Sequence, residues 1–184
     1  MNTLKGQLLI ATPQLLAPIF AKSVILMLEH NEEGAMGVIL NQPINTTVTD
    51  LAGKIFDEAF VWDKPLHLGG PVPGPLMVLH AIEEFSDQEI LPSVLYTLEA
   101  SRVQELIVRR PEPSLIIANY SGWGPGQLES EFGWDSWLTL PAKSDLVFWP
   151  GDRDLWKVVV NEVNARKLSE FLKLREMPAD PSLN

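Results

Sequence analysis

Five short apolar runs, each bounded by residues that favour turns, constrain the fold of this 184-residue chain more than any other sequence feature. They alternate little and are rich in β-branched side chains, a pattern typical of strands covered on both faces, although runs this short do not exclude helix. Three weaker candidates bring the expected number of strands to about eight. The five runs are residues 24–28, 38–40, 76–79, 115–118 and 146–149, and the weaker candidates are residues 6–11, 90–98 and 136–140.

Helical spacing of apolar residues appears in three further segments. Thr47 and Asp50 have the spacing of a capping box at the start of the first. The second runs from Glu99 to the stop at Pro111, and the third begins near Asp152 or Asp154. The apolar positions of the first segment are Leu51, Ile55 and Ala59, beside Phe56 and Phe60; those of the second are Val103, Leu106 and Ile107; and those of the third are Leu155, Val158, Val159 and Val163. A separate short tail helix is expected from Leu168, Phe171, Leu172 and Leu174.

The order of these elements predicts the fold class. Strands come in runs with helices between them and without a regular strand–helix–strand rhythm, which favours an α+β fold with a mixed or antiparallel sheet. The length fits a single domain over residues 1–184, with a tail at 178–184 that we expect to be loose. At 46% hydrophobic and 21% charged residues, the chain can bury a sizeable core.

The composition also excludes several kinds of site. With no cysteine, the chain has no disulfide framework, thiol nucleophile, thiolate zinc site or iron–sulfur cluster. Prolines and glutamines interrupt the apolar amino terminus, and no signal-peptidase site follows it. The longest uncharged run, residues 65–82, contains four prolines and three glycines, which a membrane helix would not carry together. We therefore expect a soluble, cytosolic protein without a membrane partner.

The net charge of −10 arises entirely within residues 23–101, which contain twelve acidic residues and only two basic ones, Lys54 and Lys64. The rest of the chain holds twelve acids and twelve bases, so no segment has the basic excess of a phosphate-binding surface. We expect no direct nucleic-acid binding. The acidic segment is typical of a solvated surface, and a docking face for a basic partner is the alternative.

A glycine-rich segment, residues 119–131, is the most unusual in the chain. It predicts the end of a strand, a turn, and a short helix with Gly124 as its cap and Pro125 at its first position. The Ser121 hydroxyl is the expected acceptor for the first helical amides. Two interpretations stay open, a packing turn or a binding loop with Trp123 as its aromatic anchor. A packing turn expects Trp123 to be buried with its indole nitrogen bonded inside the fold.

The three histidines, His30, His67 and His80, each end an apolar stretch and lack metal-ligand spacing. Residues 30–34 are typical of a hairpin turn with Gly34 at a special dihedral position. Residues 67–71 predict a strand end where the backbone closely approaches another strand or a ligand. Neither nucleotide-binding glycine motif nor the G-x-S-x-G nucleophile motif occurs.

Several blocks together resemble the YqgE/AlgH family of small bacterial proteins over nearly the whole chain. They lie at residues 6–13, at Phe20 and residues 23–26, at His30, and at residues 34–43, 69–71, 79–80 and 122–129. The resemblance implies a bifurcated sheet curled into a pseudo-barrel with flanking helices, in cytosolic proteins often regarded as transcriptional regulators. It brings no catalytic residue, cofactor or ligand. Ala17 stands where the family commonly has Asp, and Gln42 where Arg usually follows Asn41.

We therefore predict a non-enzymatic regulatory or accessory protein that binds an unknown protein partner or small ligand, with no metal and no cofactor. The alternative is a hydrolase or metal-dependent enzyme that uses His30, His67, His80 and nearby acids. Two histidines and a carboxylate converging in one pocket would favour the enzyme. The candidate binding residues are Ser121, Gly122, Trp123, Gly124, Gly126, Gln127, His30, Asn41, Gly69 and Gly70.

Overall fold

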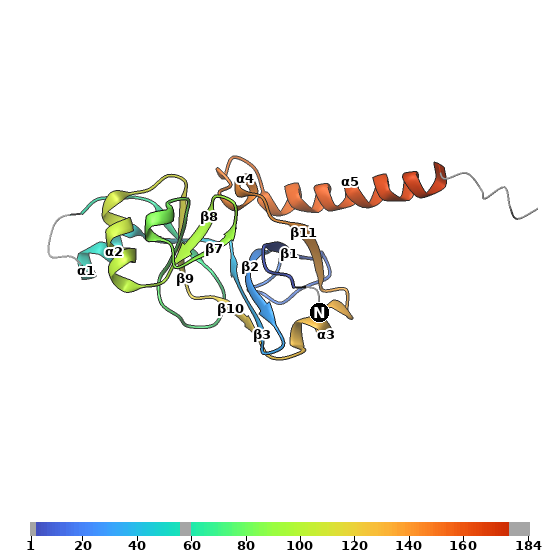
Figure 1. The fold of residues 1–184 in the computed structure, drawn as a ribbon, viewed down its shortest axis with the longest axis horizontal. Coiled ribbons are helices and arrows are strands. Elements are labelled where there is room, and N and C mark those ends of the chain that lie inside the picture. The colour runs from blue at the N-terminus through green and yellow to red at the C-terminus, as the bar shows by residue number, and fades with distance from the viewer. Residues whose placement is uncertain (1–2, 56–59, 177–184) are drawn as a thin grey trace, which may run out of the picture.

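Two β-sheets form the framework of the protein in a computed structural model that describes residues 3–55 and 60–176 (Figure 1). The first sheet has five strands in the order β10-β3-β2-β1-β11, and every neighbouring pair is antiparallel. Its strands are β1 (Gln7–Ala11), β2 (Val24–Asn31), β3 (Gly34–Ile39), β10 (Ser121–Trp123) and β11 (Trp137–Pro141).

The second sheet has six strands in the order β4-β5-β9-β6-β8-β7. Strands β5 and β9 pair in parallel and the other neighbours are antiparallel, so this sheet is mixed. Its strands are β4 (Pro43–Thr47), β5 (Pro65–Leu68), β6 (Met77–His80), β7 (Gln88–Leu91), β8 (Val94–Thr97) and β9 (Ser114–Ala118).

The chain order makes the second sheet an insertion into the first. Strands β4 to β9 all come between β3 and β10, so the chain crosses from one sheet to the other and back. We call residues 43–55 and 60–118 the inserted lobe, and residues 3–42 and 119–176 the outer lobe. In Figure 1 the inserted lobe, with α1 and α2, lies to the left of the outer lobe, which carries α3, α4 and α5.

Six helical segments accompany the sheets in the described part of the chain. They are α1 (Val48–Ile55), the 3-10 helix η1 (Glu83–Phe85), α2 (Ala100–Arg109), α3 (Gln127–Phe132), α4 (Ser144–Val147) and α5 (Leu155–Glu176). The expected capping box starts α1, because the Thr47 amide donates to the Asp50 carboxylate at 2.8 Å and the Asp50 amide donates to the Thr47 hydroxyl at 3.3 Å. None of the helices in these ranges is long and apolar enough to cross a membrane.

The hydrophobic core explains why the strongest apolar runs do not alternate. Along β1, Leu8 and Ile10 pack in a cluster that joins both sheets with α4 and α5, while Leu9 and Ala11 pack on the opposite face beneath α3. A third cluster lies between the inserted sheet and α2 and includes Leu106. Because both faces of the central strands are buried, continuous apolar runs are what their positions require.

The predicted α+β class is confirmed, with two sheets in place of one bifurcated sheet. No strand pairing among the described residues closes either sheet into a barrel, so the pseudo-barrel detail is not confirmed. Helix α2 begins after Glu99, whose carboxylate caps it, and Arg110 ends it in a left-handed conformation just before Pro111. The hairpin around Gly34 is also confirmed, with β2 and β3 as its strands. The expected tail at 178–184, together with Phe56 and Ala59, lies outside the described residues.

Several element predictions were wrong. Residues 146–149 are not a strand, because Leu146 and Val147 end the short helix α4, whose first turn is favoured by Asp145. Residues 90–98 form two strands, since a turn with Ser93 at a φ of 65° separates β7 from β8. The third helix and the expected tail helix are one continuous helix, α5. Strand β4 carries no apolar run and was missed.

Candidate functional site

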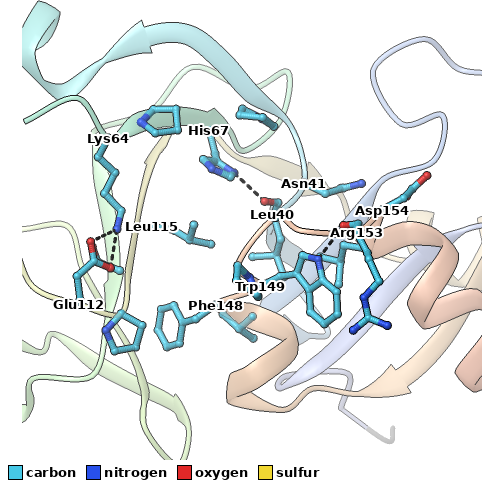
Figure 2. Close-up of a pocket in the computed structure, with 18 residues that line it drawn as sticks. Leu40, Asn41, Lys64, His67, Glu112, Leu115, Phe148, Trp149, Arg153 and Asp154 are labelled. Carbon is cyan, nitrogen blue, oxygen red and sulfur yellow. Dashed lines mark hydrogen bonds and ion pairs between the residues drawn. The ribbon is translucent and has the colours of Figure 1, made fainter.

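A cleft of about 730 Å³ opens between the two lobes (Figure 2). The inserted lobe contributes the ends of β4, β5 and β9, and the outer lobe contributes the chain after β3 together with the segment that joins α4 to α5. Apolar side chains from both lobes form much of its lining, namely Leu40, Leu115, Val147, Phe148 and Leu155. Four prolines, Pro43, Pro65, Pro113 and Pro150, also line it. The cleft therefore combines an apolar lining with backbone segments in which proline restricts the φ angle.

The charged groups that line the cleft are already paired. On one side the Lys64 ammonium lies 2.7 Å from the Glu112 carboxylate. On the other side Arg153 lies 5.3 Å from the centre of the Trp149 ring and 3.7 Å from the Asp152 carboxylate. Figure 2 shows these two groups on opposite sides of the cleft. With Asp154 held 3.5 Å from Lys157, the lining has no uncompensated charge.

His67 projects from β5 into this lining and has one ring nitrogen to spare. Its Nδ1 lies 2.7 Å from the Leu40 carbonyl oxygen, and because a carbonyl can only accept, Nδ1 carries the proton. Burial lowers the pKa of His67, the nearby Lys64 lowers it further, and the bond to Leu40 partly opposes them. The ring is therefore neutral at neutral pH, with the lone pair on Nε2. That nitrogen makes no hydrogen bond to any residue in the described ranges.

His30 and His80 use both ring nitrogens inside the fold. In His30, Nδ1 accepts from the Leu4 amide at 3.1 Å and Nε2 lies 2.9 Å from the Glu129 carboxylate. In His80, Nδ1 accepts from the Ile82 amide at 3.1 Å and Nε2 lies 2.9 Å from the Thr97 hydroxyl. Both side chains are almost fully buried. The structure thus does not bring the three histidines together, and only His67 lines the cleft.

Asn41, Gly69 and Gly70 lie at the junction of the lobes. Asn41 lines the cleft, but its side chain is occupied, accepting from the Val24 amide and donating to the Lys22 carbonyl, both at 2.9 Å. A Cβ on Gly69 would lie 2.4 Å from the Asn119 carbonyl oxygen, and one on Gly70 would lie 2.3 Å from that of Tyr120. The expected close approach at these glycines is therefore to backbone of the chain that returns to the outer lobe.

The segment 121–127 is built differently from the prediction. Its first three residues are strand β10, paired with β3, and α3 begins at Gln127 after Gly126 as the cap residue, two residues later than expected. The Ser121 hydroxyl donates to the Gly69 carbonyl at 3.0 Å and does not accept from the helix start. The Gln127 side chain accepts from the Gly124 amide at 3.1 Å. Glycines 122, 124 and 126 are exposed.

Trp123 is buried, with 6% of its surface exposed. Its indole nitrogen donates to the Glu131 carboxylate at 3.0 Å, and the indole nitrogen of Trp137 donates to the same oxygen at 2.8 Å. The Trp123 ring also lies 6.4 Å from that of Phe20 and 6.2 Å from that of Trp137, measured between ring centres. This is the arrangement that the packing interpretation of the turn expects.

The candidate residues from the sequence largely miss the cleft, apart from Asn41 and the histidine of the enzyme alternative, His67. Glu112, Leu115, Phe148 and Arg153 were not among them. The prolines at 43, 65, 113 and 150 are the only shared signal in these segments, and proline alone does not indicate a site. In the parts of the chain that the structure describes, no group of three or more histidine and acidic side chains is placed to hold a metal ion.

A family model described as DUF179, AlgH-like, matches residues 8–167 of the chain. The chain belongs to the AlgH-like family. Among AlgH-like relatives, a UPF0301 protein of Chlorobaculum tepidum is 36% identical over an alignment of 185 positions that covers 97% of this chain and 95% of the relative. A UPF0301 protein of Idiomarina loihiensis is 34% identical over 173 residues, covering 89% and 92% of the two chains.

Solved structures show the same AlgH-like fold. The solution structure of the AlgH protein from Pseudomonas aeruginosa matches with a TM-score of 0.72 at 28% identity, over 97% of this chain and 96% of that one. A crystal structure of a protein from Corynebacterium diphtheriae matches with a TM-score of 0.69 at 25% identity, over 84% of each chain. The resemblance seen in the sequence blocks is therefore confirmed.

Proposed function

We propose that this AlgH-like protein acts by binding and not by catalysis, and that its binding site is the cleft between the lobes. The observation that carries the proposal is the cleft itself, about 730 Å³ in volume and lined by apolar side chains from both lobes. Small-molecule sites commonly measure roughly 300–1,000 Å³, are mostly apolar, and lie where two structural units meet. A ligand held there would contact both lobes at once.

The side chains of the cleft support binding better than catalysis. An enzyme of the alternative class needs a histidine beside a nucleophile, a second histidine or a free carboxylate. His67 has the Leu40 carbonyl on one nitrogen, and Glu112, which also lines the cleft, is paired with Lys64. His30 and His80 are occupied by Glu129 and Thr97. The scattered histidines favour the binding interpretation over a hydrolase or metal-dependent enzyme.

A titration with small neutral fragments tests the cleft directly. We expect fragments with apolar rings to shift backbone amide resonances of the non-proline residues within 64–67, 113–115 and 147–155 in two-dimensional NMR spectra, because these segments line the cleft from both lobes. Phe148→Ala removes half-buried cleft surface and is expected to weaken binding about tenfold. Trp134→Ala, at a residue 74% exposed and outside the cleft, is the matched control and should leave affinity unchanged.

Other outcomes of the titration would contradict the proposal. Shifts confined to residues 121–127 would place the contact at the glycine-rich segment, whose glycines are exposed, and would favour the binding-loop interpretation. No shifts in the cleft at millimolar fragment concentrations would remove the support for a ligand site there.

We further propose a cytosolic regulatory or accessory role that does not require direct contact with DNA. The charge pattern supports this, because three cations on or beside α5 are paired within the fold. Glu162 lies 3.1 Å from Lys143 and 2.8 Å from Arg166, and Asp154 lies 3.5 Å from Lys157. A transcriptional effect would then pass through a bound ligand or a protein partner.

The purified protein is therefore expected not to shift duplex DNA in a gel at low salt. With a net charge of −10, the protein has no overall basic excess to neutralise phosphates and drive such binding by counterion release. The measurement is an electrophoretic mobility assay on pooled genomic fragments at two salt concentrations, with a known DNA-binding protein as positive control. A sequence-dependent shift that weakens as salt rises would contradict this part of the proposal.

A further inference from the structure

The unused ring nitrogen of His67 distinguishes the cleft from an ordinary apolar hollow. Of the six ring nitrogens on the three histidines, which all lie in described segments, five face a hydrogen-bonding partner inside the fold. The sixth, Nε2 of His67, belongs to a half-buried side chain in the cleft lining. Because the Leu40 carbonyl fixes the proton on Nδ1, Nε2 offers a lone pair in a fixed direction.

The rest of the lining offers little to a charged ligand. Lys64, whose side chain is only 15% exposed, is neutralised by Glu112, and Arg153 and Asp154 each have an oppositely charged neighbour. A charged ligand would lose hydration on entering the cleft without meeting a free opposite charge. The four prolines of the lining have no backbone N–H, so they cannot donate to a ligand acceptor. The paired charges favour an uncharged ligand, and the lone pair on Nε2 of His67 favours one that carries its own donor.

Resting on the proposed binding role, we infer that the cleft takes an uncharged, largely apolar ligand that donates an N–H or O–H hydrogen bond to Nε2 of His67. A primary amide is the simplest group of this kind. Leu115 and Phe148 would contact the apolar body of the ligand, because they are half-buried apolar side chains of the lining, one from each lobe. His67 then determines which apolar molecules are selected.

Three probes that share one aromatic body test this ligand class. They are phenylacetamide, which donates, its N,N-dimethyl derivative, which cannot, and phenylacetate, which is charged. We expect phenylacetamide to bind the cleft about three- to tenfold more tightly than the dimethyl derivative, the usual net effect of one hydrogen bond. Phenylacetate should bind no better than the dimethyl derivative. Affinities are measured by NMR titration of cleft amides at neutral pH.

Two variants assign the preference to one nitrogen. In His67→Asn the side-chain amide can still donate to the Leu40 carbonyl but no acceptor remains at the Nε2 position, so the preference for phenylacetamide is expected to vanish. In His67→Gln the side-chain oxygen can replace Nε2, so the preference should persist. The comparison of the three probes on the unaltered protein needs neither variant, and it stands if a variant fails to fold.

The outcomes separate this inference from the proposed function. Equal binding of the two amides, tighter binding of phenylacetate, or a preference that survives in His67→Asn would overturn the ligand class while leaving a binding cleft in place. If neither these probes nor the neutral fragments perturb the cleft, the binding role of the cleft fails as well.

Discussion

Replacing Trp123 with alanine is expected to lower the free energy of unfolding by about 3–5 kcal/mol, the range for large-to-small changes in a packed core. Trp123 is 6% exposed and packs with Phe20 and Trp137 on the face of the first sheet that lies beneath α3. The change removes this packing and one of the two indole donors to Glu131. Urea unfolding followed by circular dichroism gives the measurement.

Two further variants separate the contributions at this site. Trp123→Phe keeps most of the apolar contact but loses the bond to Glu131, and is expected to cost less, with about 1 kcal/mol due to the hydrogen bond. Trp134→Ala, at a side chain 74% exposed and three residues beyond Glu131, should change stability by less than about 0.5 kcal/mol.

The opposite result would restore the binding-loop interpretation of residues 121–127. If Trp123→Ala unfolds at nearly the same urea concentration as the unaltered protein but no longer captures a partner from cell extract, Trp123 is a contact residue. If stability falls as expected, the glycine-rich segment is architecture around a buried tryptophan. Of its exposed glycines, Gly126 would then owe its presence to backbone geometry, because its φ is 72°.

Much of the fold was predictable because burial on both faces leaves a strong sequence signal. The runs at 24–28, 38–40 and 115–118 are central strands, and the Thr47–Asp50 capping box and the stop at Pro111 mark the ends of helices. Local signals failed where the tertiary context decided the outcome. Residues 146–149 are as apolar as a strand, yet two of them are buried as part of a single helical turn. Strand β10 contains Gly122 and is held by its pairing with β3.

The candidate site was less predictable for a geometric reason. Its lining comes from four segments far apart in the chain, around residues 40–43, 64–67, 112–115 and 147–155, and no short motif spans them. The insertion of six strands between β3 and β10 brings these segments together, which a linear pattern does not reveal. His67 was recognised as the end of a strand, but its free nitrogen depends on the Leu40 carbonyl of the other lobe.

At Gly70, in the same junction between the lobes, we expect that even the methyl side chain of alanine is not tolerated. Gly70→Ala should destabilise the protein by more than about 3 kcal/mol, because overpacking and backbone strain act together there. Its Cβ would lie 2.3 Å from the Tyr120 oxygen and 2.4 Å from both the Tyr120 carbonyl carbon and the Ser121 hydroxyl, at a φ of 154°. Relief requires moving the chain around Tyr120, whose amide and carbonyl both bond to Val72 at 3.0 Å.

Two other glycines are matched controls for this expected loss. At Gly126 a Cβ meets nothing within 4 Å but the φ is 72°, so alanine should cost only the roughly 1–2 kcal/mol of a left-handed residue. At Gly124 the nearest atom is 3.9 Å away and alanine should change stability by less than about 0.5 kcal/mol. In urea unfolding, the loss of stability should therefore be largest for Gly70→Ala, smaller for Gly126→Ala and smallest for Gly124→Ala. If Gly70→Ala unfolds within about 1 kcal/mol of the unaltered protein, the junction yields easily and the two lobes are not held together by this contact.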